Sequence, residues 1–239
     1  MSEAHAIHLS NEQALDGRVH AGVLAHIVER GHAPDAGTLA ARLDLAEDAV
    51  RASLRRLDAG HGLVLHPGGD ERVWVAHPFA TTPTPFWVTD GRGGWWGNCA
   101  WCSLGVAALL DRAVTIVTRL GGEDERVEIR VRDGRVEPSD LVVHFVLPVA
   151  RAWENVHFYC ATVLAFRSEA DVDRWCARHG IPRGKAVPIQ TVWELARAWY
   201  GGHLSEKWQK WTGSEAAAIF GSVGLTGPFW EIPGGAERF

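Results

Sequence analysis

The stretch that decides the fold and the site is Trp95-Trp96-Gly97-Asn98-Cys99-Ala100-Trp101-Cys102-Ser103-Leu104-Gly105. Asn98 is a favoured residue at a helix N-cap and apolar residues follow at helical spacing, so we predict a helix over residues 99–110. Cys99 and Cys102 would then share one face of the first turn. The positive end of the helix dipole stabilises a thiolate there, which favours reaction with soft metals and electrophiles.

The spacing of Cys99 and Cys102 has three interpretations on its own: a redox pair, half of a zinc site, or two unrelated cysteines. A zinc site takes four ligands, commonly from two such pairs, whereas Cys160 and Cys176 are single. A redox pair usually follows a strand in a βαβ unit, and no such unit is recognisable here. The motif by itself leaves all three interpretations open.

Cys160 lies in a run of β-branched and aromatic residues, 156–166, that we predict to be a strand. Alternation along that strand would place Cys160 on one face with Phe158 and would turn His157 to the other face. A buried cysteine in a strand is more often structural than catalytic. Cys176, on a predicted amphipathic helix, is interpreted as a core residue.

Residues 1–76 predict a small helical unit. Three helices and then two short strands around a tight turn are expected, over 18–30, 36–43, 47–58, 60–65 and 72–76. This order is typical of a winged helix-turn-helix. The third helix carries as many acidic as basic side chains, whereas a helix that approaches phosphates usually has a positive excess. We therefore do not expect nucleic acid to be a partner.

Residues 77–87, which contain three prolines, are predicted to form an extended linker to a second domain over residues 88–239. Strands are expected there over 86–89, 114–117, 127–131, 141–146 and 156–166, with helices over 99–110, 168–179, 192–200 and 214–220. The predicted class is α+β: a winged-helix-like helical unit followed by a mostly antiparallel sheet with packed helices.

Composition limits the function further. The 239 residues are 46% apolar and carry a net charge of -5, which argues against tight non-specific binding to nucleic acid or to anionic membranes. No apolar run is long enough for a membrane helix and no secretory signal is recognisable, so we expect a cytoplasmic protein with reduced thiols. Twelve tryptophans predict large aromatic walls around a core or a pocket. The oligomeric state is left open.

The chain resembles the alkylmercury lyase (organomercurial lyase) family over most of its length. Several separated segments carry the resemblance: Ala76-His77-Pro78-Phe79 and Pro83-Thr84 are similar to the family's linker, Ala100-Trp101-Cys102 to the segment with its first catalytic cysteine, and Phe158-Tyr159-Cys160, followed by Phe166 and Trp175, to the segment with its second. The resemblance implies a winged-helix-like unit followed by a sheet-and-helix catalytic domain.

The family's chemistry is protonolysis of a carbon–mercury bond, so the resemblance implies that Cys102 and Cys160 are catalytic and bind the metal. Thiolate is a soft ligand that suits mercury. In the family an aspartate three residues after the first cysteine relays the proton to the leaving carbon, and this chain has Gly105 there. Glu154, His157 and Asp90 are other candidate proton donors. Glu154 has the same strand parity as Cys160 but lies six residues away, His157 should face the opposite side, and Asp90 is a loop residue without geometric support.

The leading hypothesis is an alkylmercury lyase-like enzyme that acts on a small organomercurial substrate, requires no cofactor and cleaves a carbon–mercury or related carbon–heteroatom bond. Cys99 would add a third thiolate to Cys102 and Cys160, a set that suits a soft metal ion such as Hg, Cu or Zn. Two alternatives stay open: a thiol-dependent enzyme for a small organic metabolite on the same scaffold, and a thiolate metal-binding protein or metal-responsive regulator. The two-thiolate mechanism requires the two sulfurs to lie within about 5 Å of each other.

Overall fold

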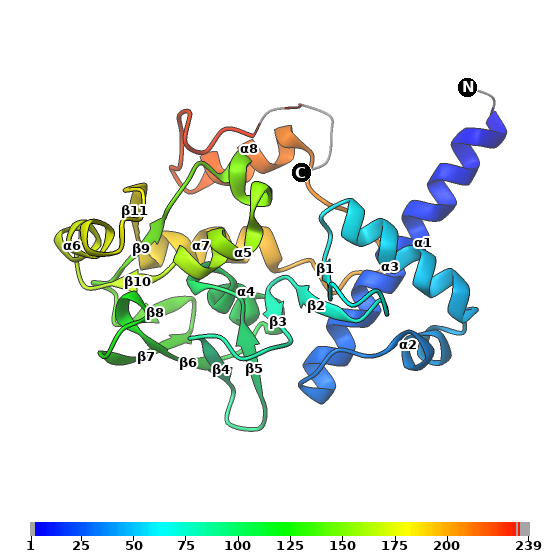
Figure 1. The fold of residues 1–239 in the computed structure, drawn as a ribbon, viewed down its shortest axis with the longest axis horizontal. Coiled ribbons are helices and arrows are strands. Elements are labelled where there is room, and N and C mark those ends of the chain that lie inside the picture. The colour runs from blue at the N-terminus through cyan, green and yellow to red at the C-terminus, as the bar shows by residue number, and fades with distance from the viewer. Residues whose placement is uncertain (1–2, 233, 235–239) are drawn as a thin grey trace.

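The computed structural model describes residues 3–232 and 234 and begins with a helical unit (Figure 1). Its elements are α1 (Glu3–Arg30), α2 (Ala36–Leu43), α3 (Glu47–Ala59) and a hairpin of β1 (Val64–Leu65) and β2 (Val73–Ala76). Asp35 accepts a hydrogen bond from the Thr38 amide at 2.7 Å and so caps α2. The predicted order of three helices and a hairpin is confirmed, although α1 begins well before the predicted residue 18.

The main sheet has eight strands in the order β1-β2-β3-β5-β4-β6-β7-β8, and every pairing in it is antiparallel. The strands after the hairpin are β3 (Phe79–Ala80), β4 (Trp87–Thr89), β5 (Gly94–Gly97), β6 (Val114–Arg119), β7 (Arg126–Arg132) and β8 (Arg135–Glu137). The hairpin of the first predicted domain and β3, which lies in the predicted linker, both belong to this sheet. The strand ladder therefore continues across both of the predicted boundaries.

A second sheet and five helices complete the fold. The sheet has the order β10-β9-β11, and its strands are β9 (Val142–Phe145), β10 (Ala165–Phe166) and β11 (Lys185–Pro188). The remaining elements are the 3-10 helices η1 (Leu120–Gly122) and η2 (Val149–Glu154) and the helices α4 (Ala100–Leu110), α5 (Val156–Thr162), α6 (Glu169–His179), α7 (Ile189–Tyr200) and α8 (Gly213–Ser222). The α+β class and the mostly antiparallel sheet are confirmed.

Helix α4 is the central element of the core. It contacts β3, β4, β5 and β6 of the main sheet and also packs along α7 (Figure 1). Every residue from Ala100 to Leu109 is buried, which explains why α4 is apolar all round. Whatever projects from its first turn therefore faces the protein interior.

The prediction of one strand over residues 156–166 is wrong for its first part. Residues 156–162 form helix α5, and only Ala165–Phe166 form a strand, β10. Asn155 accepts a hydrogen bond from the Phe158 amide at 3.0 Å, which satisfies one of the free donors of the first turn. This cap and the surrounding packing override the strand preference of the β-branched and aromatic residues.

None of the helices in the described part of the chain is both long and apolar enough to cross a membrane.

Candidate active site

The first turn of α4 is capped by a cysteine. Cys99 is the N-cap, and its Sγ accepts a hydrogen bond from the Cys102 amide at 3.3 Å. The sequence predicted Asn98 as the N-cap; its side chain instead contacts Nε2 of His77 at 3.2 Å. Cys102 is therefore the third residue of the helix, where the unpaired amides and the helix dipole favour negative charge.

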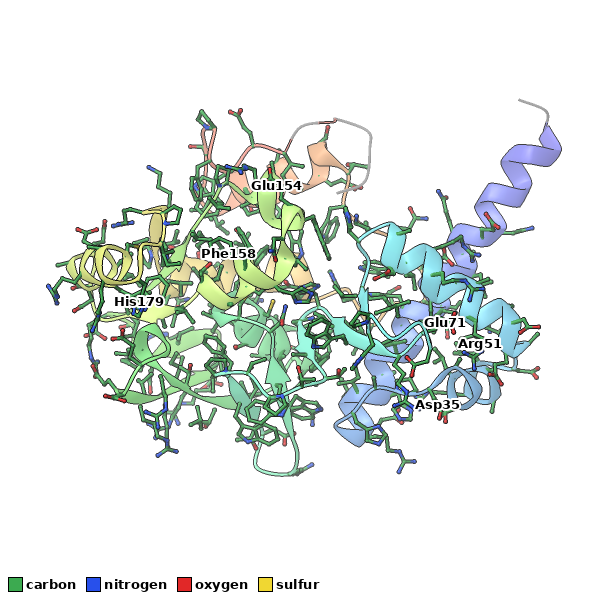
Figure 2. All side chains as sticks on the ribbon, viewed as in Figure 1. Asp35, Arg51, Glu71, Glu154, Phe158 and His179 are labelled. Carbon is green, nitrogen blue, oxygen red and sulfur yellow. The ribbon has the colours of Figure 1, made fainter. Side chains whose placement is uncertain are left out.

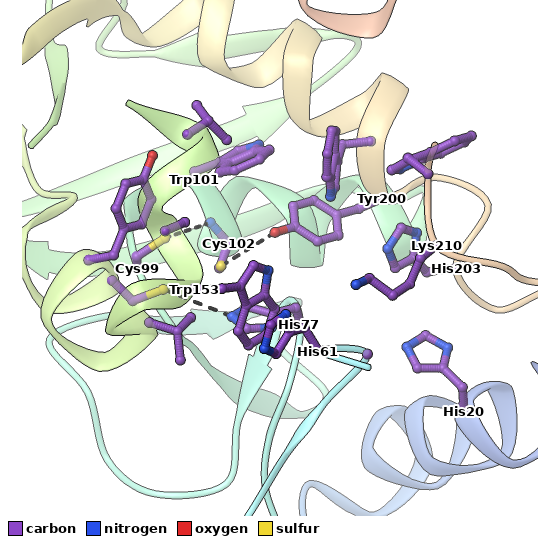
Figure 3. Close-up of a pocket in the computed structure, with 18 of the residues that line it drawn as sticks. His20, His61, His77, Cys99, Trp101, Cys102, Trp153, Tyr200, His203 and Lys210 are labelled. Atoms are coloured by element: carbon purple, nitrogen blue, oxygen red, sulfur yellow. Dashed lines mark hydrogen bonds between the residues drawn. The ribbon is translucent and has the colours of Figure 1, made fainter. Parts of the chain in front are cut away.

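Helix α5 brings the second cysteine to the same place. Cys160 Sγ lies 3.9 Å from His77 Nε2, and Cys102 Sγ lies 3.6 Å from the Tyr200 hydroxyl (Figure 3). The two sulfurs of Cys102 and Cys160 and a ring nitrogen of His77 all lie within 4.8 Å of one another. With metal–sulfur bonds of about 2.3 Å, both sulfurs are within reach of one soft metal ion.

His77 takes the third position in this group. Cys99, predicted as the third ligand, lines the same cavity but uses its sulfur to cap α4. The sequence placed His77 only in a linker, and its imidazole gave no recognisable signal because its partners are distant along the chain. A group of two cysteines and one histidine could hold a metal ion.

A cavity of about 740 Å³, part of it open to solvent, leads to these groups. Its walls come from nearly every part of the chain, from α1 to the segment that follows α7. The aromatic residues that line it include five tryptophans and three histidines besides His77: Trp101, Trp153, Trp199, Trp208, Trp211, His20, His61 and His203. The predicted aromatic walls are present, and they surround the thiols.

The three thiols of the cavity differ in acidity. Burial and the hydrogen bonds with its two neighbours raise the pKa of Cys99 well above its ordinary value. Burial alone would also raise the pKa of Cys102, but its contacts with the thiols of Cys160 and Cys99 lower it. The positive charge that His77 can carry and the Tyr200 hydroxyl add to this, so the pKa of Cys102 lies well below its ordinary value. The hydrogen bond with Cys102 raises the pKa of Cys160. The first proton is therefore lost from Cys102.

Tyr200, at the end of α7, lies beside both Cys102 and Gly105. A Cβ atom on Gly105 would lie 2.4 Å from Cδ2 of the Tyr200 ring and 3.0 Å from Cβ of Pro78. The ring thus occupies the space that a side chain at position 105 would need. Figure 3 shows the hydroxyl directed at Cys102. Sequence reasoning missed Tyr200, which is far from Cys102 in the chain and lies in no recognisable motif.

The other candidate proton donors lie elsewhere. Glu154 is paired with Arg151 at 2.7 Å, and Asp90 with Arg112 at 2.8 Å. His157 stacks on Trp74 with the ring centroids 4.3 Å apart. None of these three lines the cavity that contains Cys99, Cys102 and Cys160, although His157 and Cys160 both line a neighbouring pocket. Cys176 is also remote from it, beside His144 Nε2 at 3.9 Å, as expected for a core residue.

Known proteins that resemble this chain share its fold. A sequence model described as "MerB: Alkylmercury lyase" matches residues 79–201. A solved structure described as "Crystal structure of the mercury-bound form of MerB2" aligns with a TM-score of 0.60 at 17% identity, over 82% of this chain and 100% of that one. No curated protein matches the sequence.

The fold and the site define an α+β protein with a buried cysteine–histidine cluster that could hold a metal. The matched segment contains Cys99, Cys102, Cys160 and Tyr200 and spans more than half of the chain. The protein belongs to the alkylmercury lyase family.

Proposed function

We propose that the protein is an organomercurial lyase that uses Cys102 and Cys160 to bind the metal of its substrate and to cleave a carbon–mercury bond. The observation that carries this proposal is the approach of the two sulfurs, which lie within 4.8 Å of each other in a cavity large enough for a small molecule. Family membership supports the same reaction class. The natural substrate would be a small organomercurial compound.

The order of reactivity follows from the thiols. Cys102, with its lowered pKa, is the first nucleophile because the thiolate is the reactive form. Cys160 keeps its proton longer because its pKa is raised, so it becomes the second ligand once the metal is bound. Sulfur coordination increases electron density on the leaving carbon, which takes up a proton as the second sulfur forms its bond to the metal.

Turnover of methylmercury and phenylmercury tests the proposal, with methane and benzene measured by gas chromatography under an excess of a small thiol. Cys102→Ala and Cys160→Ala should both reduce turnover to background, because each removes one of the two sulfurs. Cys176→Ala is the matched control: it removes a buried cysteine outside the cavity and should retain wild-type turnover. Wild-type protein that releases neither hydrocarbon would contradict the proposal.

A second candidate function is stable binding of a soft metal ion without turnover. The position of His77 Nε2, 3.9 Å from Cys160 Sγ, favours it because two sulfurs and one imidazole form a ligand set for Cu(I), Zn(II) or Hg(II). Equilibrium dialysis against each ion tests it. Binding of one ion per chain that His77→Ala weakens, in a protein that cleaves neither organomercurial, would favour this function over the lyase.

A further inference from the structure

Cleavage of a carbon–metal bond to a hydrocarbon requires a proton donor close to the thiols, and the following inference rests on the proposed lyase function. Such a donor has to keep its proton at neutral pH and must not be consumed as a metal ligand. Tyr159 also lines the cavity, but its hydroxyl makes no hydrogen bond to either sulfur. The remaining groups around the sulfurs of Cys102 and Cys160 that carry a proton are the imidazole of His77, the thiol of Cys99 and the hydroxyl of Tyr200.

Only one of these three meets both requirements. The Nε2 of His77 lies 3.9 Å from Cys160 Sγ, where the metal can take it up as a ligand. The sulfur of Cys99 is itself a soft donor that the metal can take up as a ligand, besides accepting the Cys102 amide at the end of α4. Tyr200 has a hard oxygen that a soft metal binds poorly. A phenolic hydroxyl ordinarily titrates at about pH 10, so it carries its proton at neutral pH.

The position of Tyr200 fits the role of a donor. Its hydroxyl lies 3.6 Å from Cys102 Sγ, so it is close to any metal that this sulfur holds. The tight contact of its ring with Gly105, where a Cβ would come within 2.4 Å of Cδ2, fixes the ring from one side. Tyr200 is 3% exposed, so bulk water has little access to it.

We propose that Tyr200 is the catalytic acid of this site and delivers the proton to the leaving carbon. The carbon–mercury bond breaks with its electron pair on carbon, and this pair takes the hydroxyl proton of Tyr200 to form the carbon–hydrogen bond. The sulfur of Cys160 forms its bond to mercury as its thiol proton passes to the Tyr200 oxygen. The products are the hydrocarbon and mercury held by the sulfurs of Cys102 and Cys160, with Tyr200 again protonated. The reaction needs no external oxidant or reductant.

Tyr200→Phe tests the proposal because it removes the hydroxyl and keeps the ring that packs on Gly105. A general acid contributes roughly 10²- to 10⁴-fold, so kcat for phenylmercury should fall by at least about 100-fold. The variant should still bind the organomercurial through Cys102, and mass spectrometry of the intact protein should show the adduct accumulating. A merely structural role for Tyr200 would not lead to a trapped adduct.

Tyr159→Phe is the matched control, since it removes a hydroxyl from the other tyrosine of the chain, which is equally buried. It should lower kcat far less than Tyr200→Phe. A double variant tests whether another acid can replace the hydroxyl. Tyr200→Ala empties the space that the ring fills, and Gly105→Asp places a carboxyl group there. The double variant should have higher turnover than Tyr200→Ala alone.

The outcomes separate the two proposals. Wild-type turnover that Tyr200→Phe leaves unchanged would overturn the role of Tyr200 and leave the lyase standing. Wild-type protein that binds both organomercurials and cleaves neither would overturn the lyase and the role of Tyr200 together. Loss of turnover in Tyr200→Phe with the adduct retained is the result that we expect.

Discussion

At Gly105 the absence of a side chain allows the ring of Tyr200 to approach the backbone of α4. Ring atoms Cδ2 and Cε2 would lie 2.4 and 2.7 Å from a Cβ there, closer than any real Cβ contact. The buried ring has little space to move away because α7 packs along α4. Position 105 therefore controls where the hydroxyl of Tyr200 points.

Gly105→Ala should destabilise the protein although alanine is the better helix former. Extra atoms in a packed core typically cost about 1–3 kcal/mol, which exceeds the gain of roughly 1 kcal/mol in helix propensity. Thermal unfolding measures the difference. Gly221→Ala is the matched control, since Gly221 is also in a helix, α8, and a Cβ there would meet nothing within 4 Å. The control should be neutral or stabilised; an equal rise in Tm for both variants would contradict the packing argument.

Some residues of the site could be predicted from the sequence and others could not. Cys102 and Cys160 could be selected because thiol chemistry and the family resemblance pointed to them, and the structure places their sulfurs together. His77 and Tyr200 could not be selected, because their roles depend on contacts between segments that are distant in the chain. No local pattern encodes such a contact.

Among the elements, helix α3 has its positive charge balanced by neighbouring acids. Arg51 pairs with Glu71 at 2.7 Å (Figure 2). Arg55 also pairs with Glu71, at 2.5 Å, and Arg56 pairs with Asp16 at 2.6 Å. The sequence indicated this balance of charge because α3 has equal numbers of acidic and basic side chains. That Glu71 of the hairpin pairs with Arg51 and Arg55 is evident only from the structure. Guanidinium groups held in this way are less available for phosphates.

We expect the helical unit to bind duplex DNA weakly and with little salt dependence. Glu71→Gln should increase the slope of log K against log salt by up to about 0.9 for each arginine that then reaches a phosphate. Fluorescence anisotropy with a labelled duplex at several salt concentrations measures both. Glu154→Gln removes one negative charge outside this unit and controls for net charge. Tight, strongly salt-dependent binding by the wild type would contradict the expectation.

Element boundaries were predictable where the local sequence signals agreed with one another. Helix α2 begins and ends at the predicted residues because a capping aspartate and an apolar face agree. Residues 156–162 were misassigned because their side chains favour a strand, whereas Asn155 caps a helix and the core requires one. The capping asparagine was the signal in the sequence that could have identified α5.

For the whole molecule, the α+β class followed from the order of the elements, but the order of the strands did not. The main sheet places β3 between β2 and β5, and β4 between β5 and β6, an arrangement fixed by long-range pairing. The cavity depends on this arrangement, because its walls include His20 of α1 and Tyr200 of α7. A site assembled from the entire fold was beyond prediction from local patterns.

The molecule should lose stability as the pH falls from about 7 to 5. Burial lowers the pKa of His144 to about 4 and that of His203 to about 3, whereas an unfolded histidine titrates near 6.5. The unfolded state therefore binds more protons in this range. The stabilisation is complete above about pH 6.5 and falls below it by up to about 1.4 kcal/mol per pH unit for each histidine.

Urea unfolding at several pH values between 7 and 5 measures this loss. His144→Asn should reduce the slope of the unfolding free energy against pH by the contribution of one histidine. The substitution removes a ring whose Nε2 can accept the hydrogen bond of the Gly184 amide only when that nitrogen is unprotonated. An unfolding free energy that stays constant over this range would refute the assignment of neutral buried histidines.

The cavity walls come from segments that are far apart in the chain, and this determines when the site forms during synthesis. A polypeptide leaves the ribosome from its N-terminus, so Cys102 emerges well before Cys160 and Tyr200, the contacts that lower its pKa. Until those residues join it, Cys102 is an ordinary thiol, largely protonated and slow to react. The reactive thiolate thus arises only when the chain has folded around it.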